Sequence, residues 1–325
     1  MLFKSKVKTS GERKRPTVRS VGIELVKLSL LATIISPANF FLTNLLLFHP
    51  EKDTLPNPKE LSAIKSRYNT TWTDETFKTK DGTRLHGWYI QVPNAKKTFL
   101  VSHGNAGNLA YRLKIIKAIA ASGNSVFAYD YRGYGKSEGE PTCEGIAEDG
   151  LGAYDYLVKD KSVKPEDIVL YGESLGCAVS TIVSQNRPVS GIVLQSGFST
   201  ILEAARDRLP WFKLYPDETF PQRFLDNVTA YKQKHPPLLL VHGAKDWILP
   251  SRYSQEIFDN AIEPKKLVLL PNASHNNVFE ADGEIVDGAL RDFVNSLISQ
   301  TVAHNKALQQ QIPAVCATGI AAPGK

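Results

Sequence analysis

Short apolar runs alternate with longer segments of helical spacing through the middle of the chain. Strands that are apolar along their whole length are covered on both faces, and parallel strands are joined by crossovers that are usually helices. The alternation therefore predicts an α/β domain with a mostly parallel central sheet flanked by helices. The predicted strands are Thr98–Ser102, Ser125–Asp130, Ile168–Tyr171, Gly191–Gln195, Leu238–Val241 and Leu267–Leu270.

Further elements are predicted at both ends of this alternation. Two strand-like runs, Thr71–Lys78 and Arg84–Val92, flank the turn dipeptide Asp81-Gly82 and predict an opening hairpin. At the other end, Gly283–Leu297 has apolar residues at helical spacing and predicts a closing helix. We therefore assign residues 69–300 to a single domain, a common size for an α/β fold.

Positive charge is concentrated at the N-terminus. Residues 1–20 contain seven lysines and arginines and one glutamate, which accounts for the whole net charge of +6. A nucleic-acid-binding domain would carry a basic surface of its own, so the neutral remainder of the chain predicts no nucleic-acid partner. We interpret residues 1–20 as a basic N-terminal arm.

An apolar stretch without charges follows this arm. Leu28–Phe48 contains no charged residue and is about as long as a helix that crosses a bilayer. The positive-inside rule then predicts a single-pass membrane anchor over residues 21–48, with a cytoplasmic N-terminus. Pro37, Asn39 and Asn44 interrupt the stretch, so a cleaved signal peptide and an amphipathic surface helix stay open as alternatives.

Two other segments have the composition of irregular structure. Residues 49–68 are polar and interrupted by prolines, which predicts a linker, and residues 301–325 are rich in Ala, Gln, Gly and Pro, which predicts a disordered tail. Cys143, Cys177 and Cys316 are too few for a disulfide framework, and their spacing matches no metal site. We therefore expect no metal site, while compartment and oligomeric state stay open.

A G-x-S-x-G sequence directly follows one predicted strand. It runs from Gly172 to Gly176, after Ile168–Tyr171, and small residues that can open a helix come next. In such a turn the serine is held in a strained conformation, and the flanking positions need glycine because a β-carbon would clash. The helix N-terminus offers backbone N–H groups to developing negative charge. We therefore predict Ser174 as a nucleophile.

The partners of Ser174 are predicted from their order in the chain. A serine hydroxyl needs a base to remove its proton, and a carboxylate to orient that base. Asp246 and His275 follow the last two predicted strands, and the carboxyl ends of parallel strands meet at one edge of a sheet. We predict Asp246 as the orienting acid and His275 as the general base. His242 is a weaker candidate base, and the weaker candidate acids are Asp259, Glu280 and Asp282.

Two backbone N–H groups are expected to bind the oxyanion of a tetrahedral intermediate. One comes from the residue after the nucleophile, and the other from the loop after an earlier strand. Leu175 supplies the first, and Asn105 supplies the second from the run HGNAGN at His103–Asn108. We assign His103 a structural role, in which it shapes this loop by hydrogen bonding.

Five motifs carry a family resemblance. With them, residues 47–297 resemble the membrane-anchored members of the α/β-hydrolase-domain (ABHD, Bem-type) family of serine hydrolases. The resemblance implies the α/β-hydrolase fold, a Ser174–Asp246–His275 triad, no cofactor and hydrolysis of an ester, thioester or amide. An N-terminal anchor is also typical of that group. The motifs are HGNAGN at His103–Asn108, YRGYGKSEGEP at Tyr131–Pro141, GESLGCAV at Gly172–Val179, VHGAKDWILP at Val241–Pro250 and the His275 loop.

Two features bear on the substrate and on reactivity. The aromatic-rich insertion Leu209–Pro216 either forms a small cap over the site, which would suit an apolar acyl substrate, or packs in the core. Cys177 stands where the family usually has a second glycine after the nucleophile turn. We hypothesise that its thiol makes activity sensitive to alkylation.

These observations predict a serine hydrolase that cleaves an ester or thioester through an acyl-enzyme intermediate. The expected partners are a small-molecule or lipid-like acyl substrate and a membrane. A peptidase or amidase of the same fold is one alternative. Because a fold does not guarantee an activity, a non-catalytic binding protein is the other.

Overall fold

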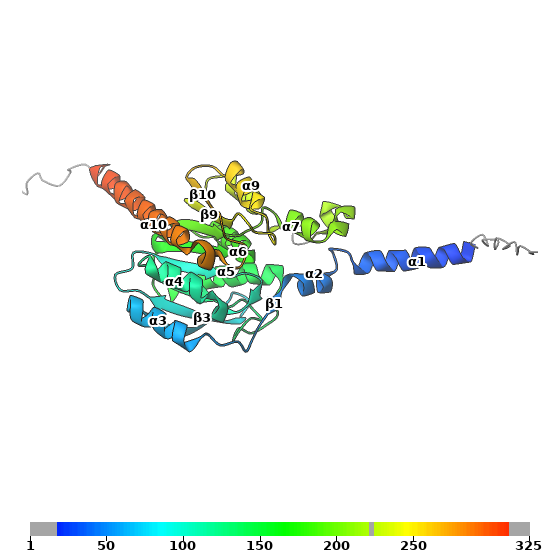
Figure 1. The fold of residues 1–325 in the computed structure, drawn as a ribbon, viewed down its shortest axis with the longest axis horizontal. Helices are drawn as coiled ribbons and strands as arrows, with labels where there is room; N and C mark the ends of the chain where they lie inside the picture. The colour runs from blue at the N-terminus through cyan, green and yellow to red at the C-terminus, as the bar shows by residue number, and fades with distance from the viewer. Residues whose placement is uncertain (1–17, 221–223, 312–325) are drawn as a thin grey trace, which may run out of the picture.

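An eight-stranded sheet forms the centre of the molecule. The computed structural model, shown in Figure 1, describes residues 18–220 and 224–311. The strand order is β10-β9-β8-β7-β4-β6-β3-β2. The strands are β2 (Thr71–Lys78), β3 (Arg84–Gln91), β4 (Thr98–Ser102), β6 (Ser125–Tyr129), β7 (Ile168–Glu173), β8 (Gly191–Gln195), β9 (Leu238–Gly243) and β10 (Lys265–Leu270).

Most of the sheet is parallel. β2 and β3 form the predicted antiparallel hairpin at one edge, and β3 pairs antiparallel with β6. All other neighbours pair in parallel. Every predicted strand is present, and its ends differ from the prediction by at most two residues. The predicted class, a mostly parallel sheet flanked by helices, is confirmed.

Helices cover both faces of the sheet. Successive residues of a strand point to opposite faces, so Val169 and Leu170 of β7 belong to two different cores. The core around Leu170 is covered by α5 (Cys143–Lys159), α6 (Leu175–Asn186), α8 (Asn227–Tyr231) and α9 (Arg252–Asn260). The core around Val169 is covered by α3 (Pro58–Tyr68), α4 (Leu113–Ala121) and α10 (Val278–Gln311). Single turns form η1 (Leu109–Arg112) and η2 (Pro165–Asp167).

The N-terminal segment forms two helices instead of one. α1 spans Val18–Ile34 and α2 spans Phe40–Leu47, and Pro37 lies in the break between them. Proline disfavours helical backbone in the residue before it and has no N–H to donate. Across the ranges 18–220 and 224–311, no helix is both long and apolar enough to cross a membrane. The single spanning helix predicted over residues 21–48 is therefore not found, and residues 1–17 lie outside the described residues.

Two segments predicted to be irregular contain helices. Within the predicted linker 49–68, Asn57 accepts the N–H of Lys59 and begins α3, whose Ile64 is buried. An asparagine cap followed by a proline strongly favours the start of a helix. The linker prediction was wrong here because it relied on the polar composition alone. Within the predicted tail 301–325, α10 continues to Gln311, through Ala, Lys, Leu and Gln, which are good helix formers. Residues 312–325 lie outside the described residues.

An insertion follows β8 at the carboxyl end of the sheet. It contains α7 (Ile201–Arg208), η3 (Pro210–Leu214) and η4 (Asp217–Thr219), and Figure 1 shows it on the same side of the molecule as α2. Phe212 and Phe220 are buried within it, with their rings edge to face and 5.4 Å apart. The Tyr215 hydroxyl donates to the Ala32 carbonyl oxygen at 2.6 Å, so the insertion also contacts α1.

Candidate active site

Ser174 lies on the sharp turn between β7 and α6. Its φ of 53° and ψ of −113° place it in a region that residues other than glycine seldom adopt. A β-carbon at Gly172 would lie 2.5 Å from the Gly176 carbonyl oxygen, so this position requires glycine. The Ser174 N–H donates to the Gln195 carbonyl oxygen at 2.8 Å, which ties the turn to β8. The predicted strand–turn–helix context of Ser174 is therefore present.

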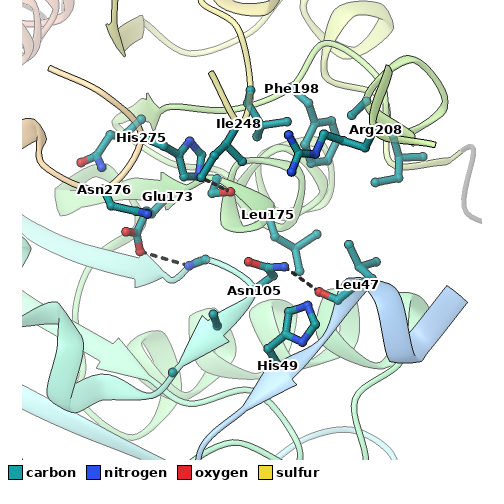
Figure 2. Close-up of a pocket in the computed structure, with 18 of the residues that line it drawn as sticks. Leu47, His49, Asn105, Glu173, Leu175, Phe198, Arg208, Ile248, His275 and Asn276 are labelled. Atoms are coloured by element: carbon teal, nitrogen blue, oxygen red, sulfur yellow. Dashed lines mark hydrogen bonds between the residues drawn. The ribbon is translucent and has the colours of Figure 1, made fainter. Parts of the chain in front are cut away.

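The three side chains predicted to act together are in contact. His275 Nε2 lies 3.2 Å from Ser174 Oγ, and His275 Nδ1 lies 2.7 Å from Asp246 Oδ2. Their loops follow β7, β9 and β10, so the sheet brings together residues that are far apart in the chain. Figure 2 shows His275 directed at the serine hydroxyl. This geometry suits transfer of the hydroxyl proton to Nε2 while Nδ1–H faces the carboxylate.

Asp246 is buried and held by several donors. Its Oδ1 accepts the N–H groups of Ile248 and Leu249, both at 2.9 Å. Burial alone would raise the pKa of Asp246, but hydrogen bonds with His242 and His275, together with the Leu249 N–H, outweigh burial and hold the pKa well below its usual range. The side chain therefore stays a carboxylate and keeps a proton on Nδ1 of His275.

The alternative base, His242, is engaged elsewhere. Its side chain is buried, with Nδ1 2.6 Å from Ser254 Oγ and Nε2 2.8 Å from the Leu249 carbonyl oxygen. Both ring nitrogens are therefore occupied by groups other than Ser174. His242 supports the loop that carries Asp246.

The alternative acids also have other partners. Asp259 accepts a hydrogen bond from Gln255 on α9, and Glu280 pairs with Lys114. Asp282 accepts the N–H groups of Asn272 and Ala273, each at 2.8 Å. Asp282 therefore holds the start of the loop that carries His275. Sequence reasoning missed this positioning role because it depends on a fold-back within the chain.

The oxyanion loop, defined here as His103–Asn108, runs beside the nucleophile. A β-carbon on Gly104 would lie 3.5 Å from Cβ of Ser174. His103 is buried, and its Nδ1 donates to the Gly104 carbonyl oxygen at 2.7 Å. That bond orients the planar peptide whose other end is the Asn105 N–H. The position of His103 therefore fits the structural role predicted for it.

The two N–H groups predicted to bind an oxyanion are available. In the part of the chain that the structure describes, neither the Asn105 N–H nor the Leu175 N–H has a hydrogen-bond acceptor. Leu175 is the first residue of α6, where N–H groups have no partner within the helix. Asn105 and Leu175 can therefore both donate to a ligand at Ser174.

Glu173 is a site residue that the sequence reasoning missed. Its Oε2 accepts the Gly104 N–H at 3.1 Å, a bond drawn from Glu173 in Figure 2. The same oxygen lies 3.0 Å from Nε of Arg112. Arg112 also donates to the Ala106 carbonyl oxygen at 2.6 Å. The pair therefore joins the nucleophile turn to the oxyanion loop. The available signal was a charged residue directly before the nucleophile, which by itself indicates no partner.

A cavity of about 820 Å³ opens beside Ser174. The insertion forms one wall and α2 contributes to another; in Figure 2, Phe198 and Arg208 lie across the cavity from Leu47 and His49. The apolar lining side chains include Leu46, Leu47, Ile115, Phe198, Ile201, Leu209, Phe212, Phe220, Ile248 and Phe279.

Leu209–Pro216 combines both predicted alternatives. Phe212 lines the cavity and is 4% exposed, because it also packs in the interior of the insertion. Leu214 is 84% exposed and lies outside the cavity lining. The insertion is therefore a small cap with its own packed interior.

Two further features of the described residues concern metal binding and thiol reactivity. Among residues 18–220 and 224–311, no cluster of three or more His, Cys, Asp or Glu side chains is suited to hold a metal ion. Cys177 is fully buried, its thiol donates to the Gly172 carbonyl oxygen, and burial raises the pKa of the thiol. A buried, neutral thiol reacts slowly, so the structure argues against the hypothesis of sensitivity to alkylation.

Known proteins are similar to this chain in sequence and in fold. A family model described as the alpha/beta hydrolase fold matches residues 97–225. An uncharacterized protein of Mycobacterium tuberculosis is 34% identical over 226 residues, which are 68% of this chain and 78% of the relative. Bem46 of Schizosaccharomyces pombe is 30% identical over 245 residues, which are 71% of this chain and 78% of the relative.

The fold comparison agrees with the sequence comparison. The solved structure of the Pyrococcus furiosus esterase Pf2001 superposes with a TM-score of 0.62 at 20% identity, over 77% of this chain and 98% of the esterase. At this identity the likeness establishes the fold alone. The chain belongs to the α/β-hydrolase fold family, with Bem46 among its relatives.

Proposed function

We propose that the chain is a serine hydrolase that cleaves an ester or thioester of an apolar acyl group. Ser174 is the nucleophile, His275 is the general base and Asp246 orients and stabilises the imidazole. One observation carries the proposal: the Ser174 hydroxyl contacts an imidazole whose other nitrogen meets a buried carboxylate. Burying a carboxylate and holding a serine on a strained turn both cost free energy of folding. The fold itself does not require either, so a catalytic role explains why they occur together.

The reaction follows from this geometry. Ser174 Oγ bonds to the substrate carbonyl carbon as its proton moves to Nε2 of His275, and the resulting oxyanion accepts the N–H groups of Asn105 and Leu175. The bond from carbon to the leaving oxygen or sulfur then breaks, and His275 returns the proton to the departing alcohol or thiol. Water attacks the acyl-enzyme and gives a proton to His275, which passes it to Ser174 Oγ as the bond from Oγ to the acyl carbon breaks and the acid leaves.

The cavity supports an apolar acyl substrate. Its lining is largely aliphatic and aromatic, and about 820 Å³ is ample for a medium or long acyl chain. The cap and α2 enclose the cavity near the nucleophile, so an acyl chain bound there would have its carbonyl carbon close to Ser174.

The test measures hydrolysis by the full-length protein. Acyl esters graded from acetyl to palmitoyl, a matched thioester series and peptide analogues are compared for the wild type and Ser174→Ala. We expect Ser174→Ala to lose roughly 10⁵-fold or more in kcat with an unchanged fold, because the nucleophile is gone. Ser180→Ala, a buried hydroxyl on the same helix α6, is the matched control and should stay within about twofold.

Each alternative has its own outcome. Full esterase activity in Ser174→Ala would end the assignment. Cleavage of the peptide analogues with no ester hydrolysis would make the chain a peptidase. A wild-type protein that hydrolyses nothing and that a fluorophosphonate fails to label at Ser174 would be a binding protein.

We also propose that the N-terminal segment associates with a lipid membrane. Within α1, Leu25, Val26, Leu28, Leu31 and Ile34 are each more than half exposed, an unusual number of uncovered apolar side chains on one helix. The basic residues before it would be attracted to anionic lipid headgroups.

Vesicle binding tests this second proposal. The full chain should float with vesicles, more strongly when they contain phosphatidylserine, and Leu28→Asp with Leu31→Asp should reduce flotation by about tenfold or more, because charged side chains resist burial in lipid. Equal flotation of this variant would contradict the proposal. Protection of an N-terminal tag from protease would show whether the segment crosses the membrane or lies on it.

A further inference from the structure

The segment that leads from α2 into the domain lies directly against the oxyanion loop. We call residues 47–51 the N-terminal strap. Its strand β1 (His49–Pro50) pairs in parallel with β5 (Ala106–Gly107), which belongs to the oxyanion loop. The His49 N–H donates to the Asn105 carbonyl oxygen at 2.9 Å, and the Glu51 N–H donates to the Gly107 carbonyl oxygen at 3.1 Å.

The strap also holds the Asn105 side chain. Asn105 Nδ2 donates to the Leu47 carbonyl oxygen at 2.7 Å, a bond visible in Figure 2. The strap therefore binds both the carbonyl and the side chain of the residue whose N–H is to meet the oxyanion. With those two groups fixed, rotation of Asn105 about its backbone bonds is restricted, and its N–H keeps one direction.

The strap itself is fixed to the domain. Phe48 is 5% exposed and belongs to the core that includes Leu175. The Glu51 carbonyl oxygen accepts the Gly135 N–H at 2.9 Å, and its carboxylate accepts the Tyr111 hydroxyl at 2.7 Å. A restraint held at both ends can transmit rigidity to the loop between Gly104 and Gly107.

We propose that the N-terminal strap is a positioning element of the oxyanion hole, so that residues outside the predicted domain contribute to kcat. The proposal rests on the proposed function. Oxyanion donors accelerate the reaction only if they are already aligned when charge develops. A misplacement of about 1 Å can cost roughly 100-fold in rate. Loss of one strap bond, with the Tyr134 hydroxyl still bound to the Asn105 carbonyl, should therefore cost about tenfold.

The principal experiment compares His49→Pro with His49→Ala in the full-length protein. Both variants remove the imidazole, but only proline removes the N–H that binds the Asn105 carbonyl oxygen. Phe48 has φ −107° and ψ 128°, a conformation that a following proline permits. We expect kcat of His49→Pro to be about tenfold below that of His49→Ala, with little difference in KM.

Two further readouts separate positioning from simple destabilisation. The affinity for a tetrahedral boronic acid inhibitor should fall by the same factor as kcat/KM, because the adduct uses the same N–H groups. Amide hydrogen exchange at Asn105, Ala106 and Gly107 should be faster in His49→Pro than in His49→Ala. If His49→Pro does not fold, Asn105→Ala, which keeps the backbone N–H and loses only the bond to Leu47, should lower kcat with KM unchanged.

The outcomes are distinguishable from failure of the proposed function. Equal kcat in His49→Pro and His49→Ala, or a difference confined to KM, would overturn the proposal even though the chain is an active hydrolase. If the wild type has no Ser174-dependent activity, the proposed function fails. The positioning proposal fails with it unless hydrogen exchange and binding of the boronic acid still differ between the two variants.

Discussion

The triad and the N-terminal strap meet at the same active site but differ in what specifies them. Ser174, Asp246 and His275 follow three parallel strands, and a parallel sheet places the loops after its strands at one edge. The strap joins the site through backbone N–H and carbonyl groups of residues 47–51, which all residue types except proline provide. The triad can therefore be predicted from residue types, whereas the strap almost cannot.

The comparison has a practical consequence for the domain boundary. We predicted an anchor over 21–48, a linker over 49–68 and a domain from residue 69. The structure describes β1 and α3 within the predicted linker, both packed on the rest of the molecule. We propose that the functional domain begins before residue 47, and that shortened proteins lacking the strap would be slow catalysts.

The largest expected effect is on the predictable side of the comparison. Asp246→Asn keeps the shape of the side chain but removes the charge that holds the Nδ1 proton, so kcat/KM should fall by about 10³- to 10⁴-fold. Asp259→Asn, on the exposed surface of α9, is the control and should be close to wild type. The measurement is kcat/KM of each variant. A loss of less than tenfold in Asp246→Asn would show that Asp246 does not assist catalysis.

The pH dependence sharpens the same assignment. The pKa of Asp246 is held well below its usual range, so the carboxylate stays ionised as the pH falls through the mildly acidic range. We therefore expect Asp246 to take up no proton over the acid limb of kcat/KM, which should show a single proton. A two-proton acid limb would mean that Asp246 titrates as well and would contradict the geometry.

A smaller effect is expected where the triad and the oxyanion loop are joined. Glu173→Ala removes the acceptor of the Gly104 N–H and the partner of Arg112, so kcat should fall by about tenfold with KM nearly unchanged. Glu173→Gln should recover part of the loss, because an amide oxygen can still accept the Gly104 N–H. Steady-state kinetics with a soluble ester measures both. Equal rates for the two variants would place the effect in the Arg112 ion pair instead.

The cap should affect substrate range more than rate. Phe212→Ala removes an aromatic ring from the cavity lining, so KM for long-chain esters should rise by about five- to tenfold while acetyl esters change little. Leu214→Ala, in the same turn η3 but 84% exposed, is the matched control. Chain-length profiles measure the change. A rise in KM that is the same for every chain length would show that Phe212 supports the cap without contacting the acyl group.

The smallest effect is expected at Cys177. Its thiol is fully buried and its pKa is raised by burial, so N-ethylmaleimide should leave the activity of the folded protein unchanged. Mass spectrometry of the treated protein locates any label. Inactivation that disappears in a Cys177→Ala variant would restore the hypothesis that this position is reactive.

The sequence by itself predicted the sheet and the three side chains that meet at its edge. Apolar runs predict buried strands, and their alternation with helices predicts a mostly parallel sheet. The nucleophile turn is recognisable because a β-carbon at position 172 would clash with the Gly176 carbonyl oxygen. These are short-range or periodic constraints, so they appear as residue types at fixed spacings. The catalytic roles of Ser174, Asp246 and His275 stay proposals until activity is measured.

Only the tertiary structure decided what surrounds that chemistry. The burial of Ile64, the Glu173–Arg112 pair and the pairing of His49 with Ala106 depend on contacts between distant segments. The pairing of His49 with Ala106 runs through backbone groups, which all residues except proline share. A sequence can therefore specify which side chains react, while the fold alone determines which stretch of main chain holds them in place.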